Sequence, residues 1–155
     1  MPQTFTRFMR RVLLFLFPIF LLSGCGGGVK KPEGFPPLFP ITITLTQDGG
    51  TLSNAMVLLV PDPEPGRWGS GGFTDAHGKA VIKTSGDFPG APAGKYKVTV
   101  RKRDGEKGQG GNVTEYCLVD PLYESATTTP LTVEVGSGNK EATLDVGKAV
   151  RIKME

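Results

Sequence analysis

From residue 41 onward, short segments in which apolar and polar residues alternate recur along the chain. One of the clearest is 41–46 (ITITLT), where the alternation places Ile41, Ile43 and Leu45 on one face and threonines on the other. Strict alternation over four to eight residues is typical of a strand with one buried face. The segment is therefore predicted to be a strand whose isoleucine and leucine side chains point into a core.

A second alternating segment is 94–102 (GKYKVTVRK). The pattern predicts that three side chains point inward: Tyr96, Val98 and Val100. It predicts that the intervening side chains point outward: Lys95, Lys97, Thr99 and Arg101.

Other segments have the composition of strands and are separated by turn residues. Residues 55–61 (AMVLLVP) form a continuous apolar run, which is consistent with a central strand. In 71–84, two strands meet at an exposed tip around Asp75–Gly78, where Asp and Gly supply turn geometry. Further strands are predicted at 130–135, 141–146 and 149–154. No convincing helical period is present, so short strands at this spacing predict an all-β fold, an antiparallel β-sandwich.

The start of the chain has a different pattern. Arg7, Arg10 and Arg11 precede an apolar run over 12–22 that only Pro18 interrupts. A helix of that run, rising about 1.5 Å per residue, is too short to cross about 30 Å of hydrocarbon. A positive end, a short apolar middle and small residues at the exit are typical of a secretory signal peptide rather than of a transmembrane anchor.

The exit of this segment, Leu22-Ser23-Gly24-Cys25, resembles the bacterial lipobox. The resemblance implies cleavage before Cys25 and a thioether-linked diacylglycerol on its sulfur. Each buried methylene contributes about 0.8 kcal/mol, so two or three acyl chains hold a protein durably on a membrane. Gly26 follows, where an aspartate would favour retention at the inner membrane, so the expected location is the bacterial outer membrane or cell surface.

Removing the signal peptide changes the charge balance. The formal net charge of +3 comes wholly from the three arginines before the apolar run, and 25–155 carries as many basic as acidic residues. The basic isoelectric point therefore gives no argument for binding to nucleic acid or to an anionic membrane. We predict a signal peptide at 1–24, a Gly- and Pro-rich flexible-to-extended tether at 25–40, and one β-sandwich domain at 41–155.

Cys117 is the only cysteine that remains once Cys25 is lipidated, so an intramolecular disulfide is not expected. Two alternatives stay open for this thiol. It is either a small buried apolar residue within EYCLV or a reactive or intermolecular thiol.

Three segments together resemble the carboxypeptidase regulatory-like domain family: FTDAHGKAVIKT (73–84), PAGKYKVTV (92–100) and PLYESATTTPLTVEVGSGNKEATLDV (121–146). The matching positions are Thr74, Asp75, Gly78, Gly94, Tyr96, Val98, Tyr123, Thr129, Pro130 and Asn139. His77 and Ala93 depart from the pattern at turn-tolerant positions. The resemblance implies a seven-stranded transthyretin-like (prealbumin-like) sandwich, common in lipid-anchored envelope proteins of some bacteria. It implies no reaction.

The sequence contains few residues or motifs that are typical of catalysis. The one histidine, His77, is expected at an exposed hairpin tip. A transthyretin-like hydrolase acting on 5-hydroxyisourate would need several histidines and a terminal Tyr-Arg-Gly-Ser, which are missing. Metal-protease, redox, nucleophile-elbow and phosphate-loop motifs do not occur, and the pair Asp62 and Glu64 is too few ligands for Ca²⁺. We therefore expect no enzyme, no cofactor and no metal site.

Three features are candidates for binding. Trp68, the only tryptophan, lies in a glycine-rich loop, where it would either stack on a sugar or peptide or cap one end of the core. Lys95, Lys97 and Arg101 form a basic stripe that either attracts an acidic polymer or is a solvated strand face. Residues 101–112 are polar and glycine-rich, either a contact loop or a disordered one.

These features together predict a protein that is exported and held on the membrane by the lipid on Cys25. Its non-catalytic sandwich would bind an envelope protein or polysaccharide and no nucleic acid. The alternative is a passive structural spacer of the envelope that packs against like domains. A hydrolase of the transthyretin-like class is the third possibility.

Overall fold

The computed structural model describes residues 30–63, 66–108 and 110–154. Lys31–Glu155 forms one compact unit, and every member of the hydrophobic core belongs to it. A segment that holds its complete core has what a domain needs to fold by itself. The predicted signal peptide and the predicted lipidation site Cys25 lie outside the described residues.

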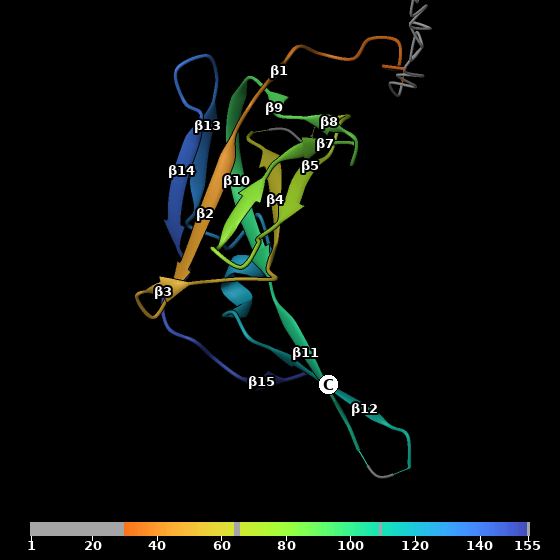
Figure 1. Cartoon of the computed structure of the whole chain (residues 1–155), viewed down its shortest axis with the longest axis vertical. Helices are drawn as coiled ribbons and strands as arrows, with labels where there is room; N and C mark the ends of the chain where they lie inside the picture. Colours follow the sequence, from red (N-terminus) through yellow and green to blue (C-terminus); the bar gives the residue numbers. More distant parts are fainter. Residues whose placement is uncertain (1–29, 64–65, 109, 155) are drawn as a thin grey trace, which may run out of the picture. The chain divides into compact units, whose positions relative to one another are not determined.

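The larger sheet has six strands, all in antiparallel pairs (Figure 1). Their order across the sheet is β13 (Thr132–Val135), β10 (Gly94–Arg101), β4 (Met56–Pro61), β5 (Ser70–Phe73), β7 (Lys83–Thr84) and β8 (Phe88–Pro89). The longest ladder of this sheet joins β10 and β4, and in it Thr99 lies opposite Leu58.

The second sheet is built around β2 (Thr42–Gln47), which pairs with β14 (Glu141–Asp145), β3 (Gly50–Thr51) and β6 (Lys79–Val81). The β2–β14 pair is parallel, which departs from the wholly antiparallel sandwich that the strand spacing predicted. A tight turn closed by the Gly136–Asn139 bridge joins β13 in the first sheet to β14 in the second. The direction of β14 is therefore set by β13 and the turn, and this direction is parallel to that of β2.

Two smaller sheets complete the fold. One consists of β1 (Leu38–Phe39) and β9 (Ala91–Pro92). The other consists of β11 (Arg103–Lys107), β12 (Val113–Cys117) and β15 (Ile152–Lys153). A 3-10 helix, η1, spans Pro121–Glu124 after β12. Because β1 belongs to the segment assigned to the tether, regular β-structure begins before Ile41.

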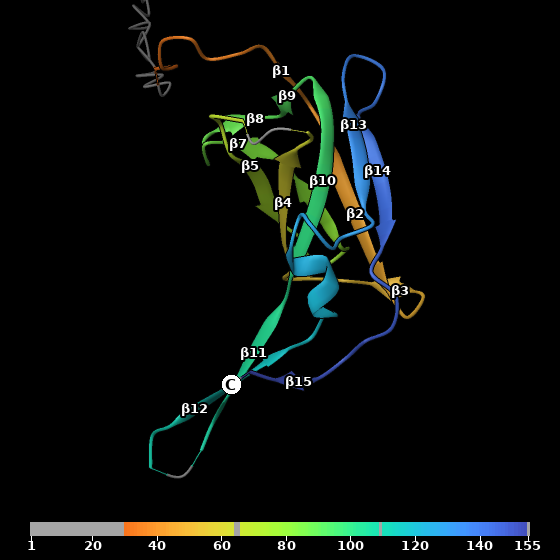
Figure 2. The same ribbon diagram turned by 180° about the vertical axis from the view of Figure 1, so that it is seen from behind.

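The core lies between the two large sheets, and Figure 2 shows their strands from behind. Ile41, Ile43 and Leu45 are fully buried, as the alternation in this segment predicted. Further members come from both sheets and from residues next to their strands: Val57, Leu59, Ala80, Ile82, Tyr96, Val98, Val100, Val135 and Val146. Apolar side chains from both inner faces make this an all-β structure of sandwich character.

The side chains of β10 that were predicted to point inward or outward do so in the structure, with one exception. Tyr96, Val98 and Val100 are buried, and Lys95 and Arg101 are exposed. Thr99 was expected to point into solvent, but it is only 7% exposed. The reason is tertiary, because η1 packs against β10 (Figure 2). Alternation along one strand cannot indicate that a later segment covers its outer face.

The turn at 75–78 has the chemistry that its sequence predicted. Asp75 Oδ1 accepts hydrogen bonds from the backbone N–H groups of His77 (2.8 Å) and Lys79 (2.9 Å), and Gly78 has a φ of +72°. The bond from the Lys79 N–H is the main cause that lowers the pKa of Asp75 below its ordinary value. The strands on either side, β5 and β6, belong to different sheets, so this turn carries the chain across the sandwich instead of closing the hairpin that the sequence predicted.

Candidate functional site

Strand β4 is buried on one face only. Val57 and Leu59 belong to the core, whereas Leu58 on the opposite face is 41% exposed. The continuous apolar run correctly predicted a central strand, since β10 and β5 flank it on either side. The pattern gave no indication that the other apolar face would be left uncovered, and this uncovered face is the most conspicuous feature of the described surface.

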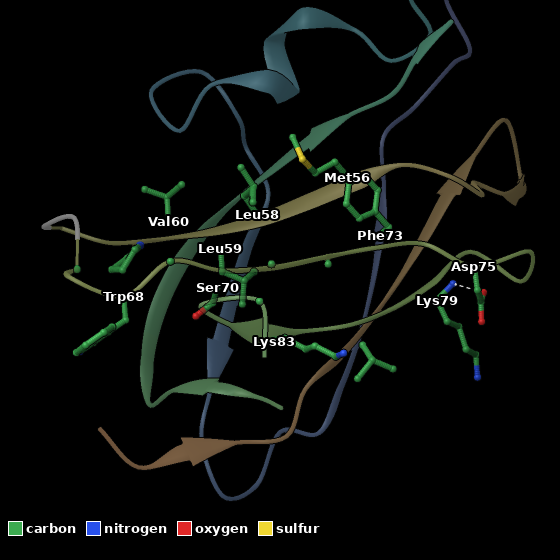
Figure 3. A pocket seen from close by; sticks show the side chains of 17 residues that line it. Met56, Leu58, Leu59, Val60, Trp68, Ser70, Phe73, Asp75, Lys79 and Lys83 are labelled. Carbon is green, nitrogen blue, oxygen red and sulfur yellow. Dashed lines mark hydrogen bonds between the residues drawn. The ribbon is translucent and has the colours of Figure 1, made fainter. Parts of the chain in front are cut away.

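An open groove of about 910 Å³ lies on this face, over β4 and β5 (Figure 3). Its apolar lining includes Met56, Leu58, Phe73 and Val81. Phe73 is 70% exposed and Val81 is 59% exposed, so both side chains stand well out of the sheet. Clustered large apolar side chains that face water usually mark an interaction surface.

Glycine at position 71 is required by the shape of this face. Gly71 lies between Leu58 on β4 and Lys83 on β7 in the sheet register. A Cβ atom at this position would lie 2.7 Å from Leu58 Cδ2 and 2.6 Å from the carbonyl oxygen of Val57. The missing side chain therefore makes room for Leu58 to lie flat across β5.

Trp68 lines one end of the groove, and Asp75 and Lys79 lie at the other end (Figure 3). The indole is half-buried, and its ring meets the ring of Phe35 edge-on at a centroid separation of 4.9 Å. Phe35 also contacts Phe88, at 4.6 Å. Trp68 therefore packs against Phe35 and also borders an open surface, and its role in binding a sugar or peptide stays a prediction.

The half-buried state of Trp68 predicts an intermediate stability effect. Trp68→Ala should destabilise the domain by about 2 kcal/mol, less than the 3–5 kcal/mol typical of a fully buried aromatic. The emission of the single tryptophan should lie between the exposed and buried extremes. Denaturant titration and a quenching series on the wild type measure both. A loss below about 0.5 kcal/mol would show that the Phe35 contact does not hold.

In the basic stripe predicted on β10, one residue is paired with an acidic side chain and another lies opposite an acidic residue of the next strand. Arg101 Nε lies 3.3 Å from Glu124 Oε2, and Lys95 stands opposite Glu134 on β13. Lys97 lies opposite Val60, so it shares the outer face with the apolar side chains of β4. Lys97 and Arg101 thus lie opposite Val60 and Met56, which line the groove, whereas Lys95 lies near the start of β10, beyond the last paired residue of β4.

Two further lysines line the groove and were missed from sequence. Lys79 and Lys83 belong to its lining, and neither forms an ion pair with any residue of the described ranges. The signal was present in KAVIKT (79–84), where Ala80, Ile82 and Thr84 are buried and the residues between them are exposed. The alternation identified the outward side chains, and only the fold could place them beside Leu58.

A second candidate surface is the sheet of β11, β12 and β15, which we call the arm. In both ribbon views the arm extends away from the strands of the sandwich (Figures 1 and 2). The guanidinium of Arg151 bonds to the carboxylates of Asp104 (3.4 Å) and Glu106, and its Cζ lies 4.0 Å from the ring centroid of Tyr116. All five residues of β11 are exposed, so polar contacts rather than a core hold this sheet together.

Cys117 lies where the arm meets the sandwich. It is a free thiol and is buried, which was one of the two alternatives from sequence. Its Sγ lies 3.5 Å from Glu124 Oε1. Burial, and then the nearby Glu124 carboxylate, raise the pKa of this thiol above its usual value, so the reactive thiolate is disfavoured at neutral pH.

The described ranges contain no group of three or more His, Cys, Asp or Glu side chains that could hold a metal ion. His77 lies at the exposed turn, as its sequence context predicted. In the same part of the chain, no helix has the length and apolar character needed to cross a membrane.

Comparison with known proteins gives little. No family model matches the sequence, and no curated protein matches it. A 9R-lipoxygenase from Cyanothece PCC8801 is similar to 77% of this chain at 16% sequence identity with a TM-score of 0.34. The aligned part is 18% of the lipoxygenase chain. A similarity at this level assigns neither a fold family nor an activity.

Proposed function

We propose that this protein is a lipid-anchored protein of the bacterial cell envelope that displays a non-catalytic β-sandwich to an envelope protein or polysaccharide. The anchor is Cys25 of the lipobox-like segment, and the display element is the arm. The outer membrane or the cell surface is the proposed location.

The single observation that carries the display role is the arm itself. A two-stranded hairpin is marginally stable in water without a core to pack on. In this protein the hairpin of β11 and β12 gains a third short strand, β15, together with the Arg151 cluster. A passive spacer needs no such element, whereas a binding module needs a shaped surface held clear of its body.

The finer fold assignment also belongs to this proposal. We propose that the sandwich is transthyretin-like with seven principal strands, as the resemblance to carboxypeptidase regulatory-like domains implies. In support, the matched turn at Thr74–Gly78 crosses between the sheets, and Tyr96 of the matched strand is a core residue. Tyr96 also donates a hydrogen bond from its hydroxyl to the carbonyl of Pro92 (2.7 Å), which fixes the entry to β10.

The anchor can be tested by Cys25→Ser. Serine keeps the size of the side chain but cannot form the thioether, so the variant should lose its lipid and shift from the detergent phase to the aqueous phase, or accumulate unprocessed. Detergent-phase partitioning of cell extracts measures this shift. Cys117→Ser is the matched control and should partition as the wild type does. Equal partitioning of Cys25→Ser and wild type would refute the anchor.

The display role and the spacer role predict different binding partners for this protein. Cross-linking in the envelope, followed by purification of the tagged protein, should recover a stoichiometric protein or polysaccharide partner. Arg151→Ala, which removes the cluster that shapes the arm, should lower that recovery. If the protein recovers only copies of itself, the spacer role is correct and the display role is wrong.

A further inference from the structure

The outer face of β4 and β5 combines two kinds of residue that interfacial proteins use together. Its centre is apolar, with Leu58, Phe73 and Val81 exposed to solvent. Its border carries Lys79 and Lys83, which have no ionic partner among the described residues. Although basic and acidic residues balance over the mature chain, positive charge is thus gathered locally around an apolar patch.

The remaining polar groups of this face leave the positive character in place. Arg101 on β10 is paired with Glu124, so it adds little charge. Asp75 also borders the groove, and the backbone N–H groups of its own turn that bond to its Oδ1 lower its pKa and keep it ionised, so the lining carries two lysines against one aspartate. Its carboxylate is held in that turn, at the end of the groove where Lys79 also lies (Figure 3).

The segment that follows Cys25 in the sequence reaches this groove at Phe35. Phe35 contacts Trp68, and Trp68 lines the groove. Phe35 lies ten positions after Cys25, and an extended chain reaches at most about 3.3–3.6 Å per residue. A lipid on Cys25 therefore keeps this end of the groove within about 35 Å of the bilayer, close enough for the face to contact it at high effective concentration.

We propose that the outer face of β4 and β5 docks on the surface of an anionic lipid bilayer. This inference rests on the anchor of the proposed function for its biological setting. Phe73 and Val81 enter the boundary between headgroups and acyl chains, Lys79 and Lys83 contact the lipid phosphates, and Trp68 lies at the interface, where tryptophan is enriched. The docked face fixes how the domain is held on the membrane.

Other occupants fit this face less well. An added peptide strand needs free backbone groups, but β4 and β5 are each paired on both sides. A sugar needs several hydrogen-bonding partners, whereas the lining is mostly apolar. Side chains as exposed as Phe73 would not enclose a single acyl chain, yet they can enter a bilayer.

The test uses the unit Lys31–Glu155, which holds the complete core and lacks Cys25. It is mixed with phosphatidylglycerol vesicles or with phosphatidylcholine vesicles and sedimented, and the emission of Trp68 is recorded. The expected result is binding to phosphatidylglycerol that weakens as salt is raised, with a blue shift of the emission. Phe73→Ser should weaken this binding about tenfold. The double variant Lys79→Gln, Lys83→Gln should weaken it roughly twentyfold.

A matched pair of valines controls for surface hydrophobicity. Val81 on the proposed face is 59% exposed and Val113 on the arm is 57% exposed. Val81→Ser should weaken vesicle binding severalfold, whereas Val113→Ser should leave it unchanged. Both side chains are on the surface, so circular dichroism should show that both variants are folded.

Three results would overturn the proposal. They are no preference for phosphatidylglycerol over phosphatidylcholine, equal losses for the two valine variants, and self-association without vesicles that Val81→Ser abolishes. The last would identify a second copy of the chain as the occupant. Because the unit carries no lipid, such a failure leaves the Cys25 anchor to its own test.

Discussion

Truncating Ile43 to alanine is expected to cost about 2–5 kcal/mol of unfolding free energy, a large part of the 5–15 kcal/mol typical of a domain. Ile43 is completely buried near the middle of β2. It lies opposite Ala142 on the parallel strand β14 and opposite Ala80 on β6. Since both neighbours are already small, they cannot expand into the space that the isoleucine would leave, and a cavity should remain.

The matched control for this prediction is Ile152→Ala. Ile152 lies in β15 of the arm and is 43% exposed, so the same chemical change should shift stability by less than about 0.5 kcal/mol. Urea unfolding of the two variants, followed by circular dichroism, gives the comparison. If both variants lose the same free energy, Ile43 does not lie in the core.

Replacing Gly90 by alanine is expected to destabilise the domain by roughly 2–5 kcal/mol, from two separate causes. Gly90 has a φ of +98°, which side-chain-bearing residues rarely adopt. An added Cβ would also lie 2.5 Å from the carbonyl oxygen of Phe39, so β1 or the bend after β8 would have to move. Because β1 pairs with β9 at this point, the variant should also release the segment that holds Phe35 against Trp68.

Gly86→Ala separates the two causes. Gly86 has a φ of +79°, but an added Cβ would meet nothing within 4 Å. Its replacement should therefore cost only the backbone strain, about 1 kcal/mol. Thermal unfolding and Trp68 emission should distinguish the variants, with a red shift for Gly90→Ala alone. Equal effects at the two positions would contradict the close approach of Phe39 to Gly90.

The parts of the fold that could be predicted from sequence are those that local alternation determines. Ile43 and Val98 each lie on a strand whose polar and apolar residues alternate, and both are buried as that pattern requires. The turn at Asp75 was equally predictable, because its carboxylate bonds to the backbone of its own turn. These features depend on residues close together in sequence.

The parts that could not be predicted depend on partners far away in sequence. Thr99 lies on the strand against which η1 packs, and β2 meets β14 in parallel because the preceding turn crosses between sheets. Leu58 belongs to an apolar run that correctly predicted a central strand, but the run gave no sign that the outer side of Leu58 would be left 41% exposed. The alternation of polar and apolar residues indicates which way a side chain points, but it does not indicate which other segment packs against that side chain.

The same limit applies to the candidate surfaces. Trp68 was singled out because it is unique and lies among glycines, and the structure places it at one end of the groove. Lys95 and Arg101 were singled out for charge alone, and Arg101 pairs with Glu124 across a sequence separation that no local pattern spans. Lys79 and Lys83 were missed because their significance comes from Leu58 and Phe73 on neighbouring strands.

The proposed start of the mature protein at a lipidated Cys25 can be tested by measuring the intact mass of the protein purified from bacterial membranes. The expected chain begins at Cys25 and carries added mass equal to a thioether-linked diacylglycerol, with or without a further acyl group. Digestion should place all of the added mass on the N-terminal peptide. A membrane-derived chain that retains Met1, or that begins at another residue with an unmodified Cys25, would show that Cys25 is not the anchor.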